Sequence, residues 1–112
     1  MKMTERESGD VVVLELSGKI MGGPDASLLN EKLHELIEAG KTKIVADLNK
    51  VDWMNSSGLG ILIGGLTTMR NNGGDLKLAN ITDRIQSLLM ITKLLTVFET
   101  FETIDKAIDS FT

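Results

Sequence analysis

Two adjacent hydroxyl side chains, Ser56 and Ser57, have the clearest chemical potential in this sequence. A serine hydroxyl can act as a nucleophile when a base activates it, and it can accept a phosphoryl group. Asn55 precedes the pair, at the expected passage from a loop into a helix. Asn and Ser also cap helix N-termini, because their side-chain oxygens accept hydrogen bonds from first-turn N–H groups. A purely structural role as a helix cap is therefore the competing interpretation.

The sequence offers no base for a nucleophilic serine. The only histidine, His34, is expected on the solvated flank of a helix, and Asp47 is interpreted as a hydrogen-bonding residue at a strand end. Activation of serine needs an adjacent base, so we predict no enzyme and no catalytic residue. The chain has no cysteine and a single histidine, which excludes thiolate chemistry and argues against a metal centre. No cofactor is expected.

Four glycines follow within eight positions, and they are Gly58, Gly60, Gly64 and Gly65. Each glycine inside a helix costs about 1 kcal/mol relative to alanine, so their number requires a physical reason. The one-turn spacing of Gly60 and Gly64 predicts close packing of another strand or helix. Gly58, near the helix start, is predicted to leave backbone N–H groups open to a partner or a phosphate.

The composition is that of an ordinary globular domain, which we expect to extend over residues 1–112. Twelve Lys and Arg residues stand against sixteen Asp and Glu, and the net charge of −4 argues against direct nucleic-acid binding. The first ten residues resemble no signal peptide, and the apolar run 58–66 is shorter than the ~20 residues of a membrane span. The sequence therefore predicts a cytoplasmic protein without a membrane span.

Apolar periodicity predicts alternating strands and helices. Strands are expected over 3–7, 11–16, 43–48, 75–79 and 94–98, and helices over 24–39, over 57–70, after Thr82 and after Thr103. Residues 49–55 are expected to form a connection in which Trp53 joins the core, while Met54 is either core or partner contact. The alternation predicts an α/β fold: a mixed, mainly parallel sheet of four or five strands with about four helices.

Two loops are expected to meet at one rim of this sheet. Residues 18–23 follow one strand, and the segment before Ser56 follows another. Sites in parallel sheets lie beyond the carboxyl ends of the strands, so the two loops are predicted to open side by side.

Residues 51–60, Val-Asp-Trp-Met-Asn-Ser-Ser-Gly-Leu-Gly, resemble the signature of STAS domains, especially bacterial anti-sigma factor antagonists. The resemblance extends over nearly the whole chain and includes the segments 16–20, 43–48, 73–76 and 94–98. It implies a STAS-like fold and a non-enzymatic switch in which Ser56, the first serine of the signature, is phosphorylated.

The resemblance also implies the partners. In the family, one protein is both anti-sigma factor and serine kinase. The unphosphorylated antagonist binds it and frees the sigma factor, the phosphorylated form does not bind, and a phosphatase resets the serine. The implied partner-binding residues are Met21, Gly22, Met54, Asn55, Ser56, Ser57, Gly58 and Leu59.

Two positions depart from the family pattern. Asn55 stands where an acid usually precedes the serine, and Met21 stands where an acid is common in the first loop. Both differences remove negative charge beside Ser56. They motivate an alternative function: a STAS binding module that is not phosphorylated, such as a regulatory subunit of a membrane transporter or a scaffold.

Overall fold

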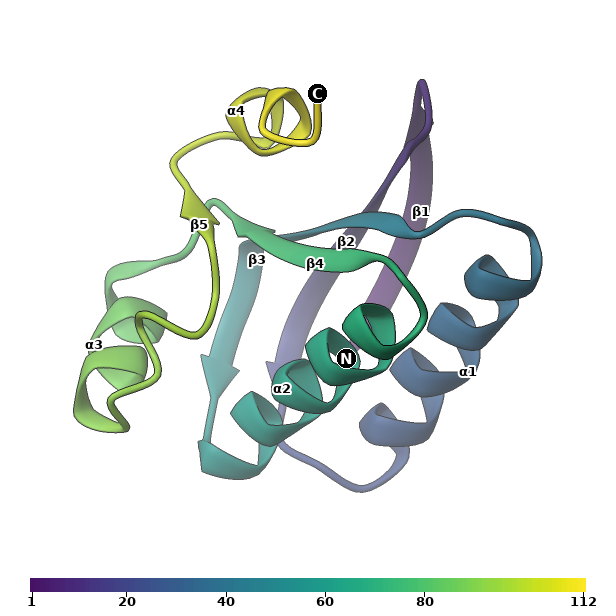
Figure 1. The fold of residues 1–112 in the computed structure, drawn as a ribbon. Helices are drawn as coiled ribbons and strands as arrows, with labels where there is room; N and C mark the ends of the chain where they lie inside the picture. Colours follow the sequence, from purple (N-terminus) through teal and green to yellow (C-terminus); the bar gives the residue numbers. More distant parts are fainter.

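The computed structural model describes all 112 residues and contains one five-stranded sheet with four helices (Figure 1). The elements are β1 (Lys2–Ser8), β2 (Val11–Ile20), α1 (Pro24–Glu38), β3 (Lys43–Met54), α2 (Ser56–Asn71), β4 (Asp75–Ala79), α3 (Asp83–Ile91), β5 (Thr100–Phe101) and α4 (Ile104–Asp109). The strands lie in chain order, β1 pairs antiparallel with β2, and all other pairs are parallel. The predicted mixed, mainly parallel α/β fold is confirmed.

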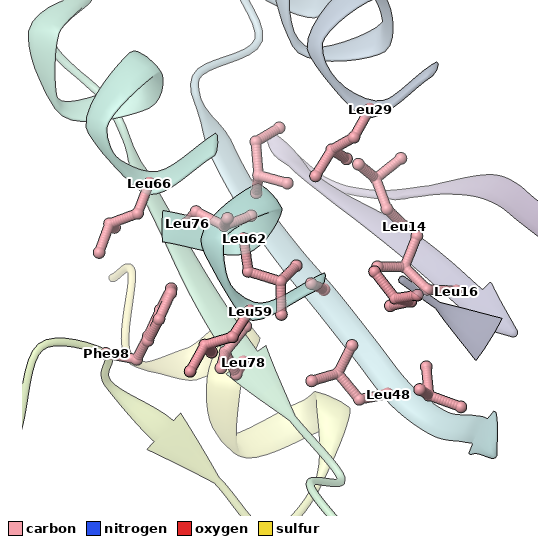
Figure 2. Packing of buried hydrophobic residues seen from close by; sticks show 14 of the residues in the cluster. Leu14, Leu16, Leu29, Leu48, Leu59, Leu62, Leu66, Leu76, Leu78 and Phe98 are labelled. Carbon is pink, nitrogen blue, oxygen red and sulfur yellow. The ribbon is translucent and has the colours of Figure 1, made fainter. Parts of the chain in front are cut away.

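Each face of the sheet carries its own hydrophobic core. The larger core contains 21 buried residues and lies under α1, α2 and α3, where leucines of α2 pack over the strands (Figure 2). The smaller core consists of Val11, Val13, Val45, Ala79 and Ala107, and α4 covers it from the other side (Figure 1). Burial on both faces explains why β2 begins with an uninterrupted apolar run instead of an alternating one.

The predicted connection over residues 49–55 is mostly strand. β3 continues to Met54 because β2 follows it as far as Ile20, through two register shifts at which β3 contains one more residue than β2. These irregularities, after Glu15 and after Gly18, allow the two strands to stay paired although the apolar alternation is interrupted. β2 and β3 therefore end together, and the first loop is shorter than predicted.

The predicted strand over residues 94–98 is absent, and the last strand is the two-residue β5. Phe98 inserts into the larger core with 4% of its surface exposed, and neighbouring apolar side chains pack against the same core. The apolar character of this segment reflects core packing by an irregular chain rather than strand pairing.

The predicted helix starts at Thr82 and Thr103 are confirmed. Ile85 donates its backbone N–H to Thr82 Oγ1 at 3.3 Å, and Lys106 donates to Thr103 Oγ1 at 3.1 Å. No helix of the chain combines the length and the apolarity that a bilayer-spanning segment needs.

Candidate functional site

The carboxyl ends of β2 and β3 form the rim on which both predicted loops lie. Ile20 and Met54 are the last register pair of the two strands. A Cβ atom placed on Gly22 would lie 3.4 Å from Cβ of Ser57, so the first loop contacts the start of α2. The prediction that the two loops lie side by side is therefore confirmed.

The helix cap at this rim is Asn55. Its Oδ1 accepts the backbone N–H of Gly58 at 2.8 Å, and its backbone carbonyl accepts the N–H of Leu59 at 2.9 Å. Ser56 is the first residue of α2, and both serine side chains are exposed. Neither hydroxyl forms a hydrogen bond within the chain. Because Asn55 alone supplies the cap, the hydroxyls of Ser56 and Ser57 remain available to other molecules.

Three of the residues that we expected to contact a partner are buried. Met54 and Leu59 expose 4% and 1% of their surface, and Gly58 is also buried. A Cβ atom on Gly58 would lie 1.8 Å from the carbonyl oxygen of Ile20, so this glycine allows α2 to start directly against β2. Its own N–H is bound to Asn55 and is not open to a ligand. These three residues support the rim from below.

The other predicted residues are exposed or partly exposed. Met21 exposes 47% of its surface, Ser56 and Ser57 are exposed, and Gly22 and Asn55 are partly exposed. This surface, called the serine rim below, is made of Met21, Gly22, Asn55, Ser56 and Ser57.

A groove between α1 and α2 opens beside the serine rim. It has a volume of about 540 Å³, and Gly22, Ser57, Gly60 and Gly64 are among its lining residues. No atom lies within 4 Å of a Cβ placed on Gly60 or Gly64, so the prediction that another element packs closely there was wrong. The close helix contact occurs at Gly65 instead, where a Cβ would lie 3.0 Å from Leu33 Cδ1.

Trp53 was predicted to join the core, but 41% of its surface is exposed. It lies near the end of β3, three positions before Ser56, and the guanidinium carbon of Arg84 in α3 is 5.0 Å from its ring centroid. The polar residues Asn49, Lys50 and Asp52 within this segment were the available signal that the strand end faces solvent. No sequence pattern indicated that Arg84 lies over the ring.

Asp25, in the first turn of α1, brings a carboxylate to the first loop, and its Oδ2 accepts the N–H of Met21 at 3.5 Å. His34 is exposed on α1, as expected, and hydrogen-bonds to neither serine. At the opposite end of the strands, where β2 and β3 begin, a hydrogen bond from Lys43 lowers the pKa of Asp10.

The family model for the STAS domain matches residues 2–107. The chain belongs to the STAS domain family. This STAS domain is 39% identical over 69 residues to the anti-sigma-B factor antagonist of Bacillus subtilis (strain 168), and the match covers 62% of each chain. The aligned region thus spans less than two thirds of that relative's length.

Solved structures share the fold. A Thermotoga maritima protein, described as a candidate anti-sigma factor antagonist, superposes on this STAS domain with a TM-score of 0.85 at 23% identity, covering 96% of this chain and 92% of that one. SpoIIAA, a Bacillus cell fate determinant solved in its phosphorylated form, superposes with a TM-score of 0.74 at 20% identity, covering 99% and 100%. At these identities the likeness shows the fold alone.

Replacing the cap residue is expected to destabilise this STAS domain moderately. Asn55→Ala removes the acceptor for the Gly58 N–H and is expected to lower the free energy of unfolding by about 1 kcal/mol. Asn55→Asp keeps an acceptor and adds a favourable charge at the helix N-terminus, so it is expected to unfold at the same urea concentration or a higher one. Urea denaturation followed by circular dichroism measures both; equal loss in the two variants would contradict the capping role.

Filling the groove glycines is expected to stabilise the domain. Gly60→Ala and Gly64→Ala meet no neighbouring atom, so each is expected to raise the free energy of unfolding by about 0.5–1 kcal/mol through helix propensity. The same urea experiment measures this. A loss of stability in either variant would show that the groove is closed in solution.

Proposed function

We propose that this STAS domain is an anti-sigma factor antagonist switched by phosphorylation of Ser56. The unphosphorylated form binds an anti-sigma factor with serine kinase activity and releases the sigma factor; the phosphorylated form does not bind; a phosphatase resets it. The observation that carries the proposal is the exposed Ser56 hydroxyl, which the helix cap does not use, at the first position of α2. The partial match to the anti-sigma-B factor antagonist supports the same function.

The domain itself tolerates a phosphate at this position. Phosphoserine carries a charge of about −1.5 to −2 at neutral pH. Ser56 is exposed, so the phosphate stays hydrated, and it stands at the positive end of the α2 dipole. Phosphorylation therefore changes the surface of the domain without unfolding it.

A partner seated on the serine rim does not tolerate the phosphate. Docking against Ser56 would remove water from the phosphate, and an uncompensated buried charge costs several kcal/mol. A thousandfold loss of affinity requires only about 4 kcal/mol. One modification is thus sufficient to separate the partners.

The two departures from the family pattern increase the contrast between the two states. Residues 53–58 carry no charged side chain, so phosphorylation takes this segment from neutral to about −2. The amide oxygen of Asn55 caps α2, so the helix start needs no acid at this position. The uncharged residues at positions 21 and 55 therefore fit a phosphorylation switch.

The proposal is tested by mapping the phosphorylated residue. The protein is incubated with ATP and the kinase-type anti-sigma factor of the same organism, and its peptides are analysed by mass spectrometry. We expect a single phosphate on Ser56, lost in Ser56→Ala and retained in Ser57→Ala. Absence of phosphate, or a phosphate elsewhere in the chain, would contradict the proposal.

Phosphorylation that depends on ATP implies that the proposed switch operates in the cytoplasm.

The neutral residues Met21 and Asn55 also suit the second candidate function, a STAS module that binds its partner without phosphorylation. Affinity capture with the unmodified domain separates the two candidates. Recovery of a kinase-type anti-sigma factor favours the switch, whereas recovery of a transporter subunit, together with an unmodified Ser56, favours the second function.

A further inference from the structure

An aromatic side chain that is not needed for core packing is exposed next to the serine rim. Trp53 is the only tryptophan and exposes 41% of its surface, although the domain has two cores that accept large apolar side chains. Arg84 lies over its ring at 5.0 Å, which is the geometry of a cation–π contact. The pair therefore presents an aromatic ring and a guanidinium side by side to the solvent.

Arg84 also lacks a carboxylate partner in an acidic chain. The other two arginines are paired, Arg6 with Glu15 at 3.9 Å and Arg70 with Asp75 at 3.3 Å. Arg84 forms no ion pair and no side-chain hydrogen bond, although acids outnumber bases by sixteen to twelve. Stacking on the ring occupies one face of the guanidinium and leaves its N–H groups free for an acceptor from outside the chain.

A second unpaired cation lies on the adjacent strand. Lys19 of β2 is the register partner of Trp53, is exposed and forms no ion pair. The strand end that carries Trp53 is thus flanked by two positive charges, although the net charge of the chain is −4. The two unpaired cations favour an acidic partner group, although the carboxylates of Asp52 and Asp83 are also exposed here.

We infer that Trp53 and Arg84 form a second anchor for the same partner that covers Ser56. The occupant is an acidic segment of the anti-sigma factor: its carboxylate binds Arg84 through paired hydrogen bonds, and an adjacent apolar side chain packs on Trp53. Planar guanidinium groups match carboxylates in this way, and Trp and Arg dominate the energetics of protein interfaces. The identity of the partner rests on the proposed function.

The test is a binding titration with the kinase-type anti-sigma factor of the same organism, at two salt concentrations. Arg84→Gln is expected to weaken binding about tenfold or more and to reduce the salt dependence of the affinity. Arg84→Lys keeps the charge but loses the planar fork, so it is expected to fall between Arg84→Gln and the wild type. The control is Lys93→Gln, which removes an exposed, unpaired cation after the far end of α3 and is expected to bind within about twofold of the wild type.

The emission of the single tryptophan reports directly on this anchor. In the wild type, the partner is expected to shift the Trp53 emission maximum to shorter wavelength, because docking removes water from the ring. If the wild type binds but Arg84→Gln matches its affinity and salt dependence, the second anchor is overturned and the proposed function stands. A loss of affinity without a change in salt dependence also overturns the anchor, because it indicates a structural role for Arg84. If the unmodified wild type does not bind at all, the proposed function fails as well.

Discussion

Replacing Ser56 with glutamate is expected to weaken binding to the anti-sigma factor by about 100- to 1,000-fold, that is by about 3–4 kcal/mol. The carboxylate places a charge at the centre of the serine rim, where docking would remove its water. Ser56→Ala removes only a hydroxyl that makes no hydrogen bond within the chain, so it is expected to bind like the wild type and to resist the kinase. Isothermal titration calorimetry with the three proteins measures the difference.

A control for net charge is available at the other end of the strands, away from the serine rim. Ser8 is exposed at the end of β1 and is the register partner of Val11, where β2 begins. Ser8→Glu adds the same charge as Ser56→Glu but is expected to bind within about twofold of the wild type. Equal losses in both variants would show that overall charge, rather than the serine rim, determines binding.

Gly58→Ala is expected to cause the largest loss of stability of any single change at the site, about 3 kcal/mol or more. The added Cβ would lie 1.8 Å from the carbonyl oxygen of Ile20 and 3.1 Å from Cγ of Met54. The first contact is with backbone, so α2 must move away from β2 to relieve it. The midpoint of urea denaturation measures the loss.

The matched control lies two positions further along the same helix. Gly60→Ala makes the same chemical change but meets no atom within 4 Å, so it is expected to stabilise the domain slightly. Similar denaturation midpoints for Gly58→Ala and Gly60→Ala would contradict the close approach of α2 and β2.

Regular local patterns made most of the fold predictable. The strand over residues 75–79 and the helices capped by Thr82 and Thr103 are found where the sequence placed them, because caps and alternation act within a few residues. Residues 94–98 show the limit of this reasoning. Their apolar side chains pack into the core from an irregular segment. No local sequence signal distinguishes such a segment from a buried strand.

The location of the site was predictable, but the exposure of its residues was not. Parallel topology alone brings the first loop and Ser56 to one rim. Which side chains face solvent depends on how closely α2 approaches β2, which is a tertiary property. Met54 and Leu59 are therefore buried where contacts were expected, and Trp53 is exposed where burial was expected. The glycines divide in the same way: Gly58 and Gly65 allow close packing, whereas Gly60 lines an open groove.

The central claim, that one phosphate on Ser56 abolishes docking without unfolding the domain, is tested most directly with the phosphoprotein itself. The purified Ser56-phosphorylated and unmodified proteins are each titrated into the anti-sigma factor, and their circular dichroism spectra are compared. We predict superimposable spectra and an affinity about 1,000-fold lower for the phosphoprotein. Equal affinities of the two forms, or a phosphoprotein that has lost its fold, would contradict the claim.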